Sequence, residues 1–268
     1  MTRLLIWMLL GIVLMVLTAL MLDESRQLEV TRHRLGREGE ESTPGVSIAQ
    51  VSDLHITGNA EVEESVLRVL AREKPELILF TGDMVASRKK MAALGQFLDR
   101  LDGQARKVAI PGNWEYWAGI DTTELRRFYA EHGVTLLVNE AVTFTRKGET
   151  LLLVGLDDSR HGQPDWKKAL DGHRDWSGPL LVLAHNPLTL PMIPAAERSR
   201  KNRVMLAGHT HGGQIVLFGN GWRRSQPCLS GWCRDGGMPM YVSRGLGTSV
   251  IPLRIGAPPE LALFTWHW

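Results

Sequence analysis

The stretch VSIAQVSDLH (residues 46–55) combines the first clear strand of the chain with its first chemical signal. Val46 to Ser52 is an almost unbroken apolar run, which predicts a strand buried on both faces. The run ends at Asp53 and His55, two side chains that can bind metal ions. In open α/β sheets, ligands bind beyond the carboxyl ends of the strands, so this stretch predicts an α/β fold with a site at that edge.

The same pattern returns further along the chain. Strands predicted at 76–83 and 107–113 alternate with amphipathic helices predicted at 60–73 and 91–102, and a third helix is predicted at 122–133. A repeated strand–helix order predicts parallel strands joined by right-handed crossovers. The second half of the chain is richer in strands. They are predicted at 134–138, 141–146, 150–156, 179–185, 202–208, 240–245 and 261–266.

The first 22 residues differ from the rest of the chain. Leu4–Leu22 carries no charge, and its length is close to the ~20 residues that cross a bilayer as a helix. No cleavage signature follows, so we expect a retained transmembrane anchor at 1–22. A charge-rich juxtamembrane linker with one strand at 27–34 would occupy 23–44, and a single domain 45–268. The distribution of Lys and Arg around the span leans toward a cytoplasmic catalytic domain.

Composition narrows the classes of function. The net charge is +2, and no Lys/Arg stripe is interleaved with aromatic residues, so we expect no nucleic-acid partner. The hydrophobic fraction of 44% suits a chain with a sizeable core. Cys228 and Cys233 cannot staple a domain of this size. We favour two free thiols in a loop, with a local disulfide as the alternative. The sequence does not predict an oligomeric state.

Metal-binding side chains recur where predicted strands end. Asp83 follows the second strand and Asn113 the third, while later strands end in His185, His209 and His211. Carboxylates, imidazoles and an amide oxygen suit Mn, Fe, Zn or Ni rather than an ion that prefers thiolates. Each motif alone is explained by a helix cap or a buried histidine. Their recurrence at successive strand ends predicts one shared metal site.

The ordered set D-x-H, G-D, G-N, a lone histidine after a strand and G-H-x-H resembles the calcineurin-like metallophosphoesterase superfamily, from residue 46 to about residue 266. The resemblance implies a four-layer α/β/β/α sandwich that carries two divalent metal ions. The implied ligands are Asp53, His55 and His211 for one ion, Asn113, His185 and His209 for the other, and Asp83 as a bridge. A hydroxide held between the ions would attack phosphorus, while the ions offset charge on the phosphoryl oxygens.

The segments GHTHGGQI (208–215) and YVSRGLGTSVIPLRIGAPPELALF (241–264) resemble a narrower, membrane-associated bacterial branch of phosphodiesterases and UDP-diacylglucosamine hydrolases. That branch implies a single-pass enzyme of the bacterial inner membrane. Its candidate substrate is lipid-linked, such as UDP-2,3-diacylglucosamine of lipid A biosynthesis. Two alternatives stay open: a general phosphodiesterase or phosphatase of soluble or envelope esters, and a non-catalytic, metal-stabilised membrane scaffold.

The stretch IPGNWEYW (110–117) departs from the superfamily, which usually has a proton-donating histidine where this chain has Trp114. An indole cannot act as a general acid at physiological pH. The enzyme is inactive, or Glu115 or His161 supplies the proton, or the leaving group is good enough to need no acid. We prefer the last hypothesis, since a nucleoside monophosphate leaves a pyrophosphate readily. Arg160 and Arg244 are candidate phosphate contacts, against the ordinary alternative of surface arginines.

Overall fold

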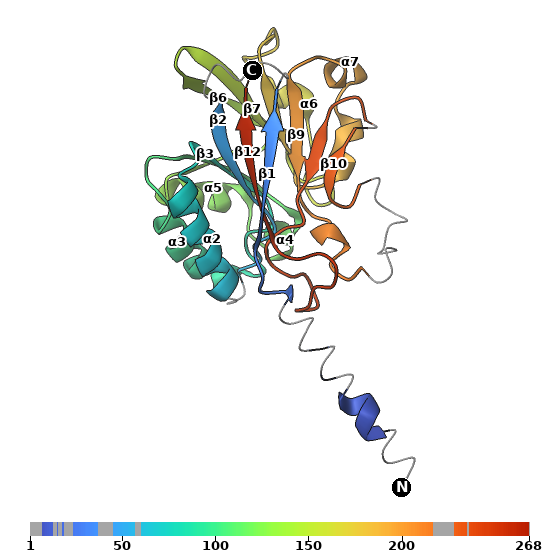
Figure 1. Cartoon of the computed structure of the whole chain (residues 1–268). Coiled ribbons are helices and arrows are strands. Elements are labelled where there is room, and N and C mark those ends of the chain that lie inside the picture. The colour runs from blue at the N-terminus through green and yellow to red at the C-terminus, as the bar shows by residue number, and fades with distance from the viewer. Residues whose placement is uncertain are drawn as a thin grey trace.

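The computed structural model describes residues 7–12, 15, 18, 24–36, 45–56, 60–216, 228–234 and 236–267. Two six-stranded sheets form its centre (Figure 1). The first sheet has the order β1 (Glu29–Leu35), β12 (Glu260–Trp266), β2 (Val46–Val51), β3 (Leu77–Thr81), β4 (Arg106–Ile110) and β5 (Val134–Leu136). The second has the order β10 (Gly231–Cys233), β11 (Met240–Val242), β9 (Arg203–Ala207), β8 (Leu180–Leu183), β7 (Glu149–Gly155) and β6 (Glu140–Arg146).

The strand–helix alternation builds the first sheet as the sequence predicts. Strands β2 to β5 are parallel neighbours. The connecting segments contain the helices α2 (Ala60–Glu73), α3 (Met91–Asp99), α4 (Asn113–Trp117) and α5 (Thr122–Glu131). Helix α3 ends three residues before the predicted boundary and α5 two residues before it. Asp121 fixes the start of α5, because its side chain accepts the backbone N–H groups of Thr123 and Glu124.

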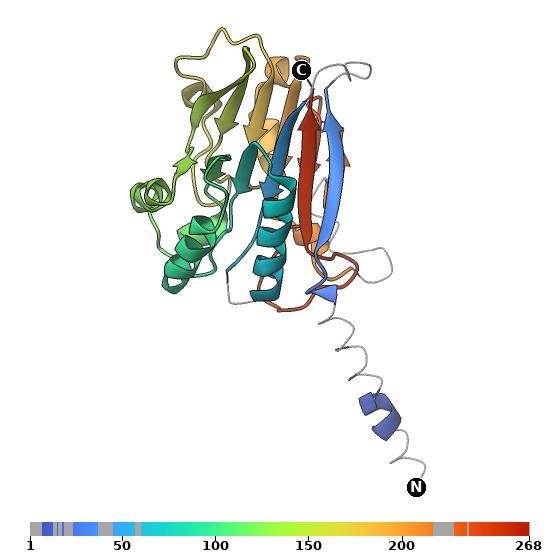
Figure 2. The same cartoon turned by 60° about the vertical axis from the view of Figure 1, so that its left-hand side comes forward.

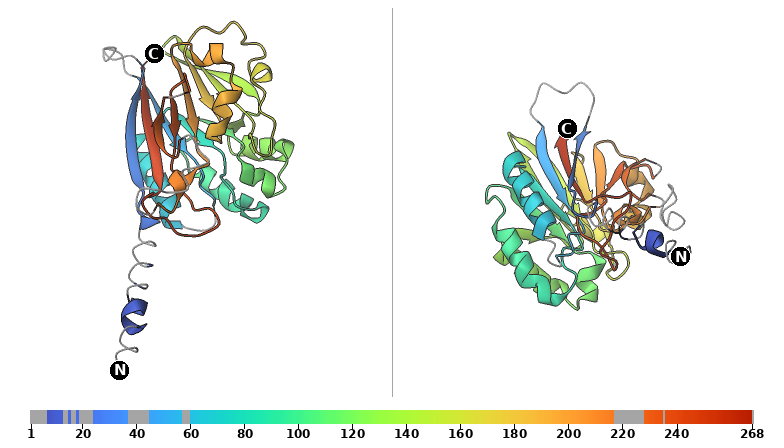
Figure 3. Two further views of the ribbon diagram at one scale, coloured as in Figure 1. Left: turned by 90° about the vertical axis from the view of Figure 1, so that its right-hand side faces the viewer. Right: turned by 60° about the horizontal axis from the view of Figure 1, so that its bottom comes forward.

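Three apolar clusters define four layers. One cluster packs α2, α3 and α5 on the outer face of the first sheet, and a second fills the space between the two sheets. The third covers the outer face of the second sheet with residues of the short helix α6 (Trp166–Ala169), of the 3₁₀ helix η2 (Pro187–Met192) and of their flanking loops. Figures 2 and 3 show the helices on opposite outer sides of the paired sheets. The predicted mixed α/β fold with two sheets is confirmed, and these layers follow the α/β/β/α order.

The strand predicted at 27–34 belongs to the domain. It is β1, which pairs in parallel with β12 and lies at the edge of the first sheet. The middle of the predicted linker 23–44 therefore contributes to the core fold, while residues 37–44 lie outside the described part of the chain.

The membrane anchor stays a prediction. Among the described residues, no helix has the length and apolar content to cross a bilayer. Most of the predicted span Leu4–Leu22 falls outside those residues. Within it, residues 7–12 are helical.

Candidate metal centre

The strand ends of both sheets bring the predicted ligands together. Asp53 and His55 follow β2, Asp83 follows β3, and Asn113 opens α4 directly after β4. From the second sheet, His185 follows β8, while His209 and His211 follow β9. These strands are parallel within each sheet, so their carboxyl ends meet at one edge. The side chains that the sequence separates by more than 150 residues lie within hydrogen-bonding range there.

The first group consists of Asp53, His55 and His211, whose ligand atoms all lie within 4.8 Å of one another. The Nε2 atoms of the two histidines are 3.1 Å apart, and Nε2 of His211 lies 3.6 Å from Oδ1 of Asp53. Burial lowers the pKa of His55 to about 4 and that of His211 well below its usual value. Both rings are therefore neutral near pH 7, the form that binds metal ions.

The second group consists of Asp83, His185 and His209. The Nε2 atom of His185 lies 3.1 Å from Oδ2 of Asp83, 3.2 Å from Oδ1 of Asn113 and 3.2 Å from Nδ1 of His209. Its Nδ1 faces the carbonyl of Thr81 at 2.8 Å, which assigns the ring proton to Nδ1. When the ring is neutral, its Nε2 is one of several acceptors that face each other, an arrangement that calls for a cation.

The charge balance of His185 agrees with this interpretation. Burial lowers its pKa, but the Asp83 carboxylate, together with the charges of Asp53 and Asp158, outweighs burial and raises that pKa to about 10. A positive charge is thus favoured at this point of the buried site, and a divalent ion would supply it in place of the proton. Spacings of 2.9–3.7 Å between donor atoms are those expected of ligands that lie ~2.0–2.2 Å from a shared ion. The residues present therefore fit a pair of divalent cations.

The ligand-bearing turns adopt a backbone conformation that side chains usually avoid. Asp53, His55, Asp83, His209 and His211 all have positive φ, between 42° and 71°. Such conformations persist only where the surrounding structure imposes them, and they cluster at functional sites. Local contacts impose them here: the Asp53 carboxylate accepts the backbone N–H of His209 at 3.0 Å, and Asp83 Oδ1 accepts that of Trp114 at 2.8 Å.

Two glycines of these turns are needed for close approach. A Cβ at Gly112 would collide with Asp83, and a Cβ at Gly208 would collide with Ser52 and Asp53. The turns that follow β4 and β9 therefore pack directly against the carboxylates, which brings the metal-binding atoms within reach of one another.

Glu115, one of the two candidate proton donors, is buried against the backbone. Its carboxylate is 1% exposed and accepts the backbone N–H groups of Gly112 at 2.9 Å, Asp83 at 3.0 Å and Met84 at 2.7 Å. Burial, followed by the negative charge of Asp83, raises the pKa of Glu115 to about 7. The structure makes this side chain an anchor between the turns after β3 and β4. Both carboxylate oxygens are engaged by the backbone, and the role of Glu115 as an acid candidate stays a prediction.

Trp114 and His161, by contrast, lie on one row of rings. The Trp114 ring lies edge-on to His55, with centroids 5.1 Å apart, and Trp114 contacts Trp117 at 5.2 Å. His161 is exposed and contacts Trp117 at 5.2 Å. His161 is thus placed at the outer end of the row, two rings away from His55.

The two candidate phosphate arginines have different surroundings. Arg160 is exposed, and its positive charge is among the causes that lower the pKa of His209 to about 3, after burial and the charge of His185. Arg160 therefore lies within electrostatic reach of the centre. Arg244 pairs with Glu29 at 2.9 Å and with Glu260 at 3.4 Å, so its guanidinium is already engaged.

Sequence reasoning missed two other groups beside the centre. Arg254 is fully buried and donates to the carbonyls of Ala257 at 2.8 Å and Arg244 at 2.9 Å, close to His211. No local sequence signal identifies it. Asp157 and Asp158 directly follow β7, the same strand-end signal that identified the ligands.

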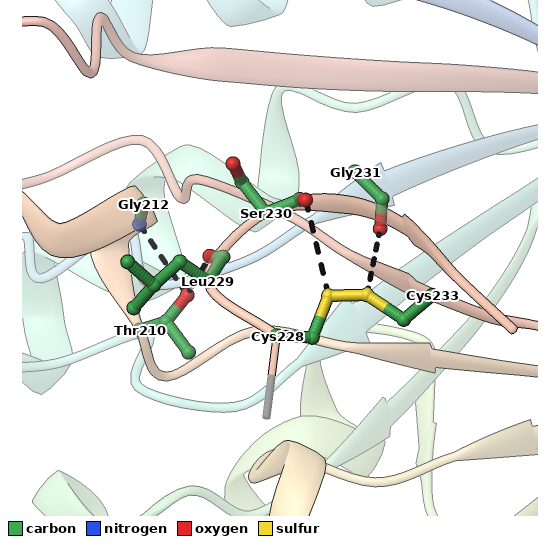
Figure 4. The surroundings of a disulfide bond; sticks show 7 residues. All are labelled: Thr210, Gly212, Cys228, Leu229, Ser230, Gly231 and Cys233. Carbon is green, nitrogen blue, oxygen red and sulfur yellow. Dashed lines mark hydrogen bonds between the residues drawn. A yellow bond between two sulfur atoms is a disulfide. The ribbon is translucent and has the colours of Figure 1, made fainter. Parts of the chain in front are cut away.

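The cysteines are paired. Cys228 and Cys233 form a disulfide with Cα atoms 6.2 Å apart, so the preference for free thiols is wrong (Figure 4). The bridged segment is tied to the histidine turn, since the Thr210 hydroxyl donates to the Leu229 carbonyl at 2.5 Å. The disulfide loop thereby supports the turn that holds His209 and His211. Trp232, on β10 in the bridged segment, packs against Tyr241.

Comparison with known proteins agrees with this geometry. The model of the calcineurin-like phosphoesterase family matches residues 46–213. The chain is 30% identical over 255 residues to the metallophosphoesterase YkuE of Bacillus subtilis, covering 90% of this chain and 86% of that protein. It is 29% identical over 244 residues to the phosphodiesterase YaeI of Escherichia coli, covering 88% and 87%.

Among solved structures, the 5′-nucleotidase precursor of Thermus thermophilus has a TM-score of 0.50 at 15% identity. The match covers 82% of this chain but only 54% of that protein. At this level of identity, the likeness supports the fold alone.

Proposed function

The chain belongs to the calcineurin-like phosphoesterase family, and from this premise we propose that it cleaves a phosphodiester or pyrophosphate bond at a two-metal centre. As a member of this family it is a metal-dependent phosphoester hydrolase. The observation that carries the proposal is the convergence of two buried groups of donor atoms at the ends of strands from both sheets. The proposed ligands are Asp53, His55, Asp83, Asn113, His185, His209 and His211.

Each side chain has a distinct part in this proposal. Asp83 would hold both ions, because its Oδ2 lies 3.1 Å from Nε2 of His185 and 3.7 Å from Nε2 of His55. Asn113 completes the second group, with its Oδ1 2.9 Å from Nδ1 of His209. When bound, two divalent cations offset charge on the phosphoryl oxygens and make water nucleophilic near neutral pH. The identity of the ions is open among Mn, Fe, Zn and Ni.

The absence of an acid from the position of Trp114 bears on the bond that is cleaved. Glu115 is committed to the backbone, and His161 lies at the far end of the ring row. A missing general acid costs about 10²–10⁴-fold when the leaving group is poor. We therefore favour a leaving group that needs no protonation, such as a phosphate monoester released from a pyrophosphate. A rate that depends steeply on leaving-group pKa would support this, and a flat dependence would contradict it.

The disulfide indicates on which side of the membrane the catalytic domain lies. Disulfides persist in oxidising compartments and are rare in the cytosol. The Cys228–Cys233 bridge therefore favours an extracytoplasmic domain, against the lean from Lys and Arg counts. The anchor at residues 4–22 remains part of the proposal, supported by large exposed apolar side chains such as Trp7 and Met15. Labelling of the two cysteines in intact cells with a thiol reagent that does not cross the membrane, with and without prior reduction, tests on which side of the membrane the domain lies.

This placement affects the choice of substrate. UDP-2,3-diacylglucosamine satisfies both the anchor and the leaving-group argument, but an extracytoplasmic domain favours the alternative of soluble or envelope phosphate esters. We propose a screen of the purified chain with Mn²⁺, Fe²⁺, Zn²⁺ and Ni²⁺ against aryl diesters, monoesters and nucleoside-diphosphate lipids. Release of UMP from the lipid would select the first substrate. Failure to hydrolyse any ester with any ion would overturn the proposal and favour the alternative of a non-catalytic, metal-stabilised scaffold.

A further inference from the structure

We propose that Trp114, Trp117 and His161 form a stacking platform for a planar ring carried by the leaving group, as in a nucleoside 5′-phosphate. This inference rests on the proposed function. The three rings form a row from the metal centre to the surface, with centroid separations of 5.2 Å and neighbouring planes inclined by 67° and 68°. Because neighbouring rings meet edge to face, a ligand ring would stack on one of them, the exposed Trp117, while the other two hold its indole in place. The row begins against His55, a proposed ligand, at 5.1 Å. A ring on the platform would therefore be attached close to the phosphorus under attack.

The outer part of the row is exposed without an evident structural need. Trp117 is 54% exposed although its side chain is among the largest available. An exposed tryptophan beside a metal centre is typical of a binding surface, because its amphipathic ring offers contact area at little entropic cost. Trp114 lies deeper and is half-buried. The platform thus descends from solvent toward the centre.

Hydrogen bonds hold the two halves of the platform in place. Trp114 and Trp117 lie on α4, and His161 lies on the loop after β7. The Tyr116 hydroxyl donates to Asp157 Oδ1 at 2.5 Å, which joins α4 to that loop. Asp158 Oδ1 accepts the backbone N–H of His161 at 2.8 Å. The loop conformation is therefore set before any ligand binds, as expected of a preorganised site.

The chemistry of the surroundings favours a ring over an acyl chain. His161, which contacts the outer indole, and its chain neighbour Arg160 are polar and exposed, whereas an acyl chain would require a continuous apolar groove. Arg160 also places positive charge near His209, where a ligand phosphate would lie. An aromatic platform beside a positive charge is the arrangement that binds nucleotide bases together with their phosphates.

Equilibrium binding tests the platform. Uridine 5′-monophosphate and methyl phosphate carry the same phosphate and differ in the ring, so calorimetry of the Mn²⁺-loaded chain separates ring contacts from phosphate contacts. Loss of one base–aromatic contact corresponds to a factor of roughly 5–150 in affinity. Trp117→Leu should weaken the binding of uridine monophosphate by this factor and leave the binding of methyl phosphate unchanged. Trp117→Phe should largely restore the binding of uridine monophosphate.

A control keeps the interpretation specific. Phe128→Leu removes a ring from a different ring–histidine pair, in which Phe128 of α5 lies 4.8 Å from His132, directly after the helix. This variant should leave the binding of both ligands unchanged. Equal weakening of both ligands by Trp117→Leu, or no weakening of either, would overturn the platform.

Kinetics extend the test to turnover. Trp117→Leu should raise KM for a nucleoside-diphosphate alkyl ester but not for a dialkyl diphosphate, whose leaving group is also a phosphate monoester. A KM that rises equally for both substrates would contradict the platform. If no ester is hydrolysed at all, the proposed function fails, while monophosphate binding still decides the platform by itself.

Discussion

Replacing Glu115 by glutamine should loosen the two turns that carry Asp83 and Asn113. The Glu115 carboxylate is 1% exposed, and its Oε2 accepts the N–H groups of Gly112 at 2.9 Å and Asp83 at 3.0 Å. Its Oε1 accepts that of Met84 at 2.7 Å. One side chain thus fixes the end of β3 relative to the end of β4, and both turns contribute to the proposed second metal site.

The magnitude follows from the donors that would lose an acceptor. Glutamine keeps one oxygen and replaces the other with an NH₂ group, which faces backbone donors and cannot accept from them. A buried donor left unsatisfied costs about 1–3 kcal/mol. One or two donors are lost, and removal of a buried charge offsets part of this cost, so we expect a loss of about 2 kcal/mol in the free energy of unfolding. Glu115→Ala removes all four acceptor contacts, including the longer one from the Val85 N–H at 3.4 Å, and should cost about 4 kcal/mol.

Urea unfolding followed by circular dichroism measures this loss, and calorimetry with Mn²⁺ measures the expected fall in metal affinity. Glu131→Gln, at an exposed position near the end of α5, is the matched control and should leave both quantities unchanged. If Glu115→Gln unfolds within about 0.5 kcal/mol of the parent and binds Mn²⁺ equally well, Glu115 is not an anchor of the centre.

Three further outcomes are expected. Chelation of divalent ions, Asp83→Asn or His209→Ala should each lower phosphodiester hydrolysis more than about 100-fold, with folding checked by circular dichroism; retained activity would exclude the two-metal centre. Arg254→Met should cost about 3 kcal/mol in urea unfolding, because buried carbonyls lose a charged donor; an unchanged midpoint would contradict this. Reduction of Cys228–Cys233 should cost about 2 kcal/mol and shift thermal unfolding downward, whereas Cys228→Ser should match the reduced parent and not respond to reductant.

The local pattern of the chain was sufficient for much of the fold. Apolar runs such as residues 46–52 and the helical spacing at 60–73 predicted β2 and α2. The alternation of strands and helices predicted the parallel order of β2 to β5. These features depend on the periodicity of apolar residues, which is a local property. Helix ends were placed less accurately, because the last turn depends on contacts outside the helix.

The candidate ligands were also identified from sequence, since each stands directly after an apolar run. Their arrangement in space follows from pairing between distant strands, which residue spacing does not encode. The Nε2 atoms of His55 and His211 approach to 3.1 Å only because β2 and β9 end at the same edge of two different sheets.

Tertiary structure decided the role of side chains whose type allowed several. Glu115 and His161 were equivalent acid candidates by sequence, and burial against four backbone N–H groups separates the first from the second. The sequence placed Cys228 and Cys233 in one loop but not as a pair. In the structure they form a disulfide, and the loop between them is bonded to Thr210. The sequence by itself determined which residues can bind a metal ion and on which strands they lie. The three-dimensional fold decided which polar groups face the ions and which face the backbone, because desolvation and hydrogen-bond geometry depend on neighbours that are remote in the chain.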